Sequence, residues 1–154
     1  MQTLEAHGSM QTLDLARVLA ATGMRVDGEA LSFDGWARRD ATQTLHITGK
    51  GGHERTVPVT DPVAWSILSD PDRYLPMMKL SYRTHSRNWK RAVEAAQIGS
   101  KLPTPHAVRH YYATQAYAKC KDIRVVQDLL GHADYGTTAR YIGVDIERMR
   151  SAVS

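Results

Sequence analysis

Residues 104–144 read TPHAVRHYYATQAYAKCKDIRVVQDLLGHADYGTTARYIGV, and this stretch decides both the fold and the chemistry that the chain can carry. Thr104 and Pro105 form a helix start, an N-cap hydroxyl followed by proline at the first helical position. A second helix start follows at Asp122, and Gly131 is a typical helix end. The stretch therefore predicts two consecutive helices with polar residues at the beginning of the first and directly after the second.

Residues suited to phosphate chemistry stand at these helix ends. His106 and Arg109 are one helical turn apart, and both donate hydrogen bonds that suit phosphate oxygens. His132 comes directly after the second helix, and Tyr141 lies nine residues further on, in a short helix expected after Thr138. Taken singly, a histidine after a helix-ending glycine is more often a capping residue, and a lone tyrosine is more often a packing residue.

A metal site is a weaker interpretation of the same histidines. His106 and His110 are four residues apart, which is the spacing of helical zinc ligands. The metalloprotease pattern has Glu directly after the first histidine, whereas this chain has Ala107. The single cysteine, Cys120, also excludes a cysteine-rich zinc site. We therefore expect no metal here, with structural histidines as the alternative.

Composition favours one globular domain in a reducing compartment. The chain has 154 residues, of which 42% are hydrophobic, and this length suits a single core. The lone Cys120 excludes an internal disulfide. No apolar run approaches the roughly 18 residues needed to span a bilayer, and the N-terminus lacks the pattern of a secretory signal. We expect a soluble, cytoplasmic protein without a membrane partner.

Positive charge is concentrated in one third of the chain. Residues 1–48 carry four Arg against six acidic residues, a net charge of −2, whereas residues 73–124 carry eleven Lys or Arg against two acidic residues, a net charge of +9. Trp89 and Val93 predict a helix whose other face is basic. This block predicts binding to a polyanion such as DNA, and a solvated basic face without a partner is the alternative. The expected DNA-binding residues are Arg83, Arg87, Lys90 and Arg91.

The upstream part of the chain is expected to combine helices with one β-hairpin. Apolar residues at helical spacing predict a helix that ends at Gly23. Alternating apolar residues predict strands around 45–47 and 57–59, joined by the glycine-rich turn 48–54. Pro58 places the second strand at an edge or marks its end. The fold class is thus mainly α with a small antiparallel β-sheet (α+β).

The domain organisation is expected to be simple. Asp61 and Pro62 begin a helix, which the sequence Asp-Pro-Asp at 70–72 ends. Residues 1–10 repeat Met-Gln-Thr-Leu around Gly-Ser, so we expect a tag or a disordered N-terminus there. Residues 11–154 then form one domain, with no interdomain linker.

The motifs, taken together and in order, resemble a known family. Residues 104–144 carry Pro-His-x-x-Arg-His, Leu-Leu-Gly-His and Thr-Thr-x-x-Tyr, and closely resemble the C-terminal signature of the tyrosine recombinases, the phage integrase family. Ala-Thr-Gly-Met-Arg at 21–25 resembles the first arginine motif of that family. Residues 49–59 resemble its β-hairpin lysine motif. The resemblance runs from about residue 13 to residue 146 and implies the family's catalytic-domain fold.

The resemblance implies a catalytic site with Tyr141 as the nucleophile. The two arginines of this site would bind the phosphate oxygens with a further hydrogen bond from the second histidine. The first histidine would take the proton of the tyrosine, and the lysine would protonate the departing 5′ oxygen. The residues implied to complete the site are Arg25, Lys50, His106, Arg109 and His132.

The implied activity is site-specific DNA recombination or integration through a covalent 3′-phosphotyrosyl intermediate, without metal, ATP or another cofactor. The implied partners are double-stranded DNA and other recombinase protomers, as a tetramer on DNA and as a monomer or weak assembly without it. The alternatives are a catalytically silent DNA-binding module of the same fold and nicking-closing activity like that of a type IB topoisomerase.

Two departures from the family pattern stand out. The family's acidic residue usually follows the first arginine by three positions, whereas Glu29 follows Arg25 by four, as though Gly28 were inserted. One extra residue rotates a helix by about 100°, so that either a bulge absorbs it or Arg25 points elsewhere. The second departure is length, because family members usually carry a separate N-terminal DNA-binding clamp domain, which is expected to be absent here.

Overall fold

The computed structural model describes residues 9–32, 38–39, 41–97, 104–132 and 138. Its helices are α2 (Met10–Thr22), α3 (Pro62–Ser69), α4 (Pro71–Lys79), α5 (Tyr82–Ala95), α6 (Pro105–Cys120) and α7 (Ile123–Leu130). A π-helix η1 (Val26–Ala30), a 3-10 turn η2 (Lys50–Gly52) and the strands β1 (Arg38–Arg39), β2 (Thr44–Thr48) and β3 (Glu54–Pro58) complete it. The predicted class, mainly α with a small antiparallel sheet, is confirmed.

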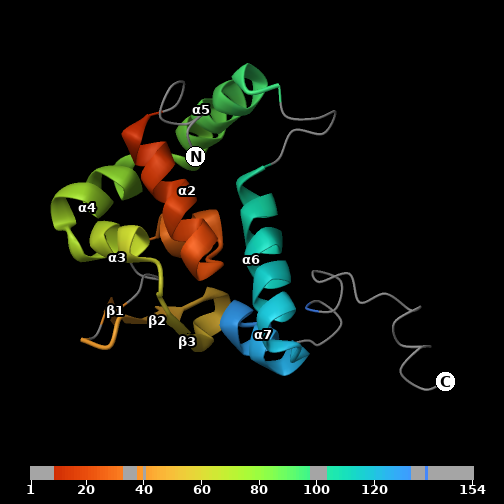
Figure 1. Ribbon diagram of the computed structural model, residues 1–154. Coiled ribbons are helices and arrows are strands. Elements are labelled where there is room, and N and C mark those ends of the chain that lie inside the picture. Colours follow the sequence, from red (N-terminus) through yellow and green to blue (C-terminus); the bar gives the residue numbers. More distant parts are fainter. Residues whose placement is uncertain (1–8, 33–37, 40, 98–103, 133–137, 139–154) are drawn as a thin grey trace.

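Helix α2 lies at the centre of the molecule, where it contacts α3, α4, α5 and α6 (Figure 1). Because it has neighbours on several sides, its apolar residues are buried on more than one face. Leu13 packs with Trp89 of α5, and Leu15 and Leu19 belong to the larger cluster with α3 and the sheet. Gly23 ends α2 in the left-handed conformation, as predicted, at φ 64°.

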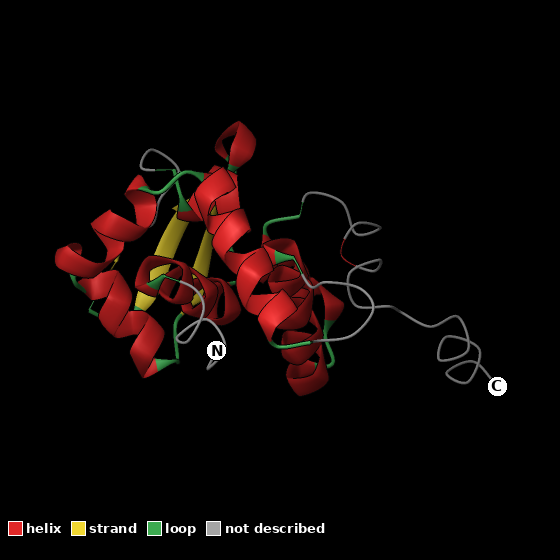
Figure 2. Ribbon diagram, turned by 90° about the horizontal axis from the view of Figure 1, so that it is seen from above, coloured by secondary structure: helices red, strands yellow, loops and turns green. Residues whose placement is uncertain are grey.

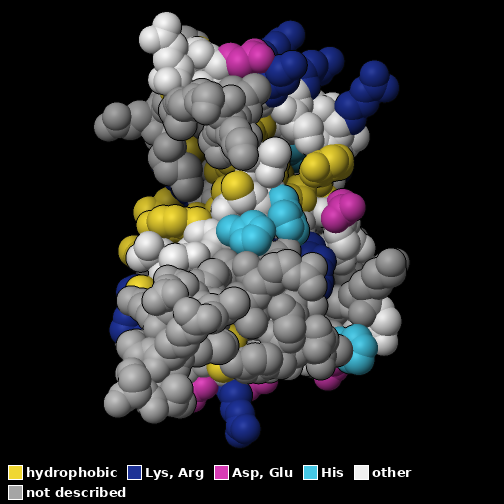
Figure 3. Space-filling view, turned by 90° about the vertical axis from the view of Figure 1, so that its right-hand side faces the viewer, with side chains coloured by type: hydrophobic (Ala, Val, Ile, Leu, Met, Phe, Trp, Pro, Cys, Tyr) yellow, Lys and Arg dark blue, Asp and Glu magenta, His cyan; other side chains and the backbone are white. Residues whose placement is uncertain are grey.

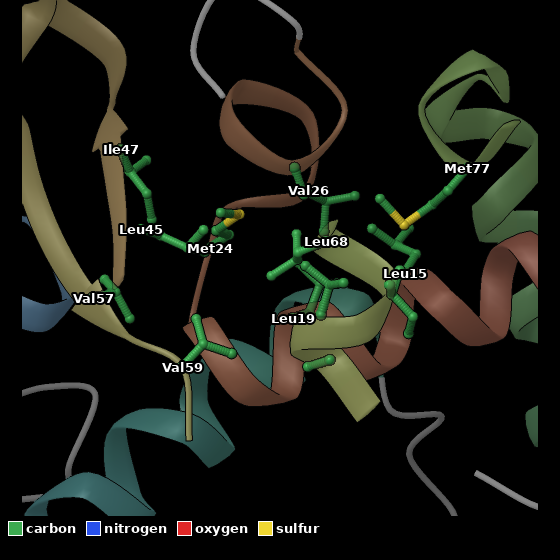
Figure 4. Close-up of a cluster of buried hydrophobic side chains, with 14 residues drawn as sticks. Leu15, Leu19, Met24, Val26, Leu45, Ile47, Val57, Val59, Leu68 and Met77 are labelled. Atoms are coloured by element: carbon green, nitrogen blue, oxygen red, sulfur yellow. The ribbon is translucent and has the colours of Figure 1, made fainter. Parts of the chain in front are cut away.

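The sheet is antiparallel with strand order β1-β2-β3, and its strands are visible between the surrounding helices in Figure 2. Alternate residues of β2 and β3 point into the core, and Leu45 pairs with Val57 in the register. Together with Val59 they contact Met24 and the apolar face of α3 (Figure 4). Because alternate residues of the hairpin are buried against the helices, the packing determines which face of the hairpin points inward. Pro58 is the last residue of β3, at the edge of the described sheet, as predicted.

Two local details differ from the sequence prediction. Asp70 ends α3 but also caps α4, because its side chain accepts a hydrogen bond from Asp72 N at 3.0 Å. The sequence prediction interpreted Asp-Pro-Asp as a break only, although Asp followed by Pro is also a helix start. Strand β1 has only two residues, which is too short for a sequence pattern to predict it.

The first described helix begins close to the segment expected to be a tag. Ser9 is the N-cap of α2, and its hydroxyl accepts a hydrogen bond from Thr12 N at 3.2 Å. Met10, the first residue of α2, lies within the segment 1–10, and residues 1–8 lie outside the described part of the chain. None of the helices in the described ranges combines the length and apolar composition that crossing a bilayer requires.

Candidate active site

Arg25 lies three residues after the end of α2, at the N-cap of η1. In η1, Ala30 N donates to Arg25 O and Leu31 N donates to Val26 O, each at 2.9 Å, so the turn contains one residue more than an α-helical turn. This π-helix contains Gly28, so a bulge absorbs the extra residue. Arg25 then faces the acidic residue despite the changed spacing, because its Nη1 donates to Glu29 Oε1 at 2.9 Å.

Glu29 is a fully buried carboxylate that joins three arginines. Arg55 donates to it from both amino groups, at 2.8 and 2.6 Å, and Arg25 donates from its backbone N at 2.8 Å and from its side chain. Arg109 Nη1 lies 3.9 Å from Glu29 Oε2. Burial by itself raises the pKa of Glu29, but the hydrogen bonds and charges of these arginines outweigh it and lower the pKa. We call these four residues the arginine cluster.

Arg109 comes from the second turn of α6 and is 1% exposed. Its Nη1 donates to the carbonyl of Gly23, and its Nη2 donates to the carbonyl of Leu130 at 2.6 Å. Nη2 also lies 3.0 Å from His132 Nε2. Arg109 thus ties the end of α2 to the end of α7, which brings the predicted residues Arg25, Arg109 and His132 into one connected site.

His132 follows the left-handed Gly131 that ends α7, and the imidazole is buried between two side-chain partners. Its Nδ1 lies 2.9 Å from the hydroxyl of Thr138, and its Nε2 lies near Arg109. Because an arginine only donates, Nε2 accepts and Nδ1 carries the proton. Burial, helped by Arg109, Arg25 and Arg55, lowers the pKa of His132 to about 4. His132 is therefore neutral near pH 7.

His106 lies on the first turn of α6 and is exposed, unlike a structural core histidine. Its ring is 5.5 Å from that of His110, at an interplanar angle of 87°. Partial burial, His110, Arg109 and Arg25 together lower the pKa of His106. A neutral imidazole at the surface is able to accept a proton. Among the described residues, no group of three or more His, Cys, Asp or Glu is arranged to hold a metal ion.

Two predicted catalytic residues are placed only in part or not at all. The backbone of Lys50 begins η2, in the turn between β2 and β3, and its side chain is not described. Tyr141 and the short helix expected around it lie outside the described residues. Sequence reasoning missed the central position of Glu29 and any role for Arg55. The available signals were the position of Glu29, four residues after Arg25, and the occurrence of Arg55 within the matched motif at 49–59.

The predicted DNA-binding residues share one exposed face of α5. Trp89 and Val93 are buried on the other face of the same helix, as their spacing predicts. Figure 3 shows histidine side chains together near the middle of the molecular face that carries α6, and Lys and Arg side chains gathered at the top of that face, where Figure 1 places α5. The exposed basic residues of α5 are Arg83, Arg87, Lys90 and Arg91.

Comparison with known proteins agrees with this geometry. The chain matches the phage integrase family over residues 1–148. Tyrosine recombinase XerC of Methylobacterium sp. (strain 4-46) is 38% identical over 151 residues, which cover 88% of this chain and 46% of that protein. Tyrosine recombinase XerD of Bradyrhizobium diazoefficiens is 31% identical over 160 residues, which cover 90% of this chain and 50% of that protein. The chain thus spans about half the length of these relatives.

Solved structures share the fold at lower sequence identity. The XerH site-specific recombinase bound to palindromic difH substrate, in a post-cleavage complex, matches with a TM-score of 0.70 and 23% identity over 99% of this chain and 49% of that one. A lambda integrase(75-356) dimer bound to a COC′ core site matches with a TM-score of 0.69 and 19% identity over 92% of this chain and 54% of that one. With the family match spanning nearly the whole chain, the protein belongs to the phage integrase family, that of the tyrosine recombinases.

Proposed function

We propose that this chain carries the catalytic site of a site-specific DNA recombinase or integrase. The arginine cluster is the observation that carries the proposal. Its described side chains are three arginines and one glutamate, a net charge of 3 − 1 = +2, and the neighbouring His132 is neutral. A buried excess of positive charge is unfavourable unless an anion joins it. A phosphate of the DNA backbone is such an anion, and it would reach Arg25 first, whose side chain is 37% exposed.

In the proposed reaction the phenol oxygen of Tyr141 attacks a DNA phosphorus atom. The bond between that phosphorus and the 5′ oxygen breaks, and a 3′-phosphotyrosyl bond forms. A tyrosine with a reference pKa near 10 is ionised in about one molecule in a thousand at pH 7, which corresponds to about 4 kcal/mol. We assign the removal of its proton to His106, since the lowered pKa keeps this exposed imidazole neutral.

The remaining site residues stabilise the transition state and the leaving group. Arg25 and Arg109 bind the non-bridging oxygens, on which negative charge accumulates. His132 joins them when its Nε2 exchanges its contact with Arg109 for a phosphate oxygen. In that exchange the ring proton of His132 moves from Nδ1 to Nε2. The Thr138 hydroxyl then donates to Nδ1 instead of accepting from it, because a hydroxyl both donates and accepts. The ammonium of Lys50 gives its proton to the 5′ oxygen.

Rejoining reverses these steps. A 5′-hydroxyl of another strand attacks the phosphotyrosyl phosphorus and displaces Tyr141. Because the phosphotyrosyl bond conserves the energy of the broken linkage, the cycle uses no ATP. The proposed side chains supply the charges and protons, so the scheme requires no metal.

The basic face of α5 is proposed to contact phosphates of the DNA backbone. Such contacts add affinity that falls with salt, and they carry little sequence information. We further propose that protomers assemble on the DNA as a tetramer and associate weakly without it, and that the protein acts in the cytoplasm. The lambda integrase neighbour, a dimer on its core site, is compatible with assembly on DNA.

The test is covalent capture from a pool of nicked duplexes with a random central sequence, at low salt. Nicking near the cut site releases a short fragment and traps the phosphotyrosyl bond. We expect the wild-type chain to form a denaturation-resistant adduct enriched for one sequence, and the Tyr141→Phe variant to form none. DNA binding without an adduct would favour a silent DNA-binding module. Adducts without sequence enrichment would favour an activity of the type IB topoisomerase kind, and an adduct with Tyr141→Phe would contradict the assigned nucleophile.

A further inference from the structure

Arg55 is a buried arginine of β3 to which the proposed mechanism gives no task. Its side chain is 4% exposed, and it pairs through both amino groups with the fully buried Glu29. Its Nε donates to the carbonyl of Leu129 at 2.9 Å, near the end of α7. One side chain therefore joins the β-hairpin, η1 and α7.

The backbones of two glycines, Gly131 and Gly49, lie close to the Arg55–Glu29 pair. A Cβ built on Gly131 would lie 2.9 Å from Arg55 Cδ, so the chain that leads into His132 runs directly against this side chain. A Cβ built on Gly49 would lie 3.1 Å from Glu29 Oε1 and 3.8 Å from Arg55 Nη1. The base of the turn that carries Lys50 therefore rests on the Arg55–Glu29 pair.

Apart from Leu129, each residue that Arg55 contacts precedes or holds a residue of the proposed site. Gly49 precedes Lys50, Glu29 holds Arg25, and Gly131 precedes His132. We propose that Arg55 is a positioning residue that sets the position of the Lys50 turn relative to Arg25 and Arg109. This inference rests on the proposed function, because it gives Lys50 the role of general acid.

The chemistry of arginine explains why the position suits this task. A planar guanidinium makes two parallel bonds to a carboxylate and still has Nε for a third partner, whereas a lysine ammonium is a point charge on a flexible stem. Arg55→Lys keeps the charge that offsets Glu29 but loses the fixed three-way geometry. Because misplacement by about 1 Å can cost about 100-fold in rate, proton transfer from Lys50 is the step most affected.

The test compares two versions of the duplex recovered by covalent capture, one with normal phosphates and one with a 5′-bridging phosphorothioate at the cut. A thiolate leaving group needs no proton, so the sulfur substrate bypasses the general acid. Single-turnover adduct formation is measured with saturating chain. We expect Arg55→Lys to be about 10- to 100-fold slow on the oxygen substrate and to recover to within a few-fold of wild type on the sulfur substrate.

Two variants serve as controls for this experiment. Lys50→Ala is the positive control and should show the same recovery on the sulfur substrate. Arg73→Lys is the matched structural control. Arg73 also pairs with a carboxylate, that of Asp14 in α2, through an amino group at 2.6 Å and through Nε at 3.2 Å. Arg73 makes none of the contacts that Arg55 makes. This variant should leave the ratio of the two rates at the wild-type value.

A second variant decides the matter if Arg55→Lys does not fold. Gly49 has φ −89°, which alanine adopts without strain, so Gly49→Ala keeps every charge and only pushes the turn away from Glu29. We expect the same substrate-dependent defect, smaller in size. Equal slowing of both substrates by the variant that folds would overturn the inference, as would Lys50→Ala without recovery. Failure of the wild-type chain to form any adduct would instead refute the proposed function.

Discussion

The arginine cluster and the exposed face of α5 are both basic, and they differ in how their charges are held. In the cluster, Arg55 and Arg109 are almost fully buried, and their guanidinium groups are fixed by a carboxylate and by backbone carbonyls. On α5, Arg83 and Arg87 are exposed to solvent on a helix whose opposite face is packed. The same residue type is therefore fixed by buried partners in one region and exposed to solvent in the other.

This difference separates the work that the two regions are suited to do. Fixed donors around a buried site stabilise developing charge without having to reorganise, so they act on the rate of a reaction. Solvated charges act through attraction to phosphates and release of counterions, so they act on affinity and its salt dependence. Substitutions in or beside the cluster should therefore change stability and reaction rate, whereas substitutions on α5 should change affinity and its salt dependence.

The largest effect is expected from the Glu29→Gln variant. Removing this charge leaves three arginines facing a neutral amide in a buried site, and breaking a buried ion pair from one side typically costs about 3–5 kcal/mol. We expect the free energy of unfolding, measured with urea, to fall by this amount. Asp14→Asn is the matched control. Asp14 is also buried, at 6% exposure, but its partner Arg73 is 33% exposed, so a smaller loss of about 1 kcal/mol is expected there. Equal losses in the two variants would show that the cluster is no more tightly coupled than a partly exposed ion pair.

The next effect is the pH dependence of stability. His132 has a folded pKa of about 4 against an ordinary value of 6.5, and burial also lowers the pKa of His85, whose ring contacts Thr12 and the carbonyl of Met77. The unfolded chain therefore binds more protons between these values, and stability is lost as pH falls below 6.5. For His132 the loss reaches about 2–4 kcal/mol near pH 4.

Urea unfolding of His132→Asn at several pH values between 6.5 and 4.5 checks this expectation. The variant should lose part of the slope of unfolding free energy against pH that the wild-type chain shows. A variant with the wild-type slope would contradict the burial of a neutral imidazole beside Arg109.

The smallest effect is expected on α5. Arg87→Gln should weaken DNA binding modestly and reduce the slope of log affinity against log salt by about 0.9 for each phosphate that the protein no longer neutralises. Its free energy of unfolding should stay within about 0.5 kcal/mol of the wild-type value, as for surface substitutions in general. Titration of labelled duplex at several salt concentrations measures the slope. An unchanged slope would mean that this face is solvated and has no part in binding DNA.

The parts of the fold that follow local rules could be predicted from the sequence. The Asp–Pro and Thr–Pro helix starts, the glycine helix ends at 23 and 131, and the alternation at 45–47 all correspond to elements of the structure. Helix α4 was missed because the same Asp–Pro signal was interpreted as a break. These signals involve neighbouring residues, so the sequence alone contains them.

The arrangement of the candidate site could be predicted only in part. Arg25, Arg109 and His132 were expected, and the structure connects them, but the π-helix that turns Glu29 toward Arg25 depends on tertiary packing. Arg55 lies 26 residues from Glu29 and 74 from Leu129, and no periodicity links such distant positions. Long-range polar contacts depend on the assembled fold, so sequence pattern alone does not reveal them.

The most direct test of the central claim measures rate and affinity separately for Arg109→Lys. On the duplex recovered by covalent capture, single-turnover adduct formation at saturating chain gives the rate, and titration gives the affinity. We expect the saturated rate to fall about 100- to 1,000-fold, as when one fixed donor is removed, with a much smaller change in affinity. A fall in affinity with a wild-type saturated rate would contradict the claim, because the buried arginines would then only bind DNA, as the face of α5 is proposed to do.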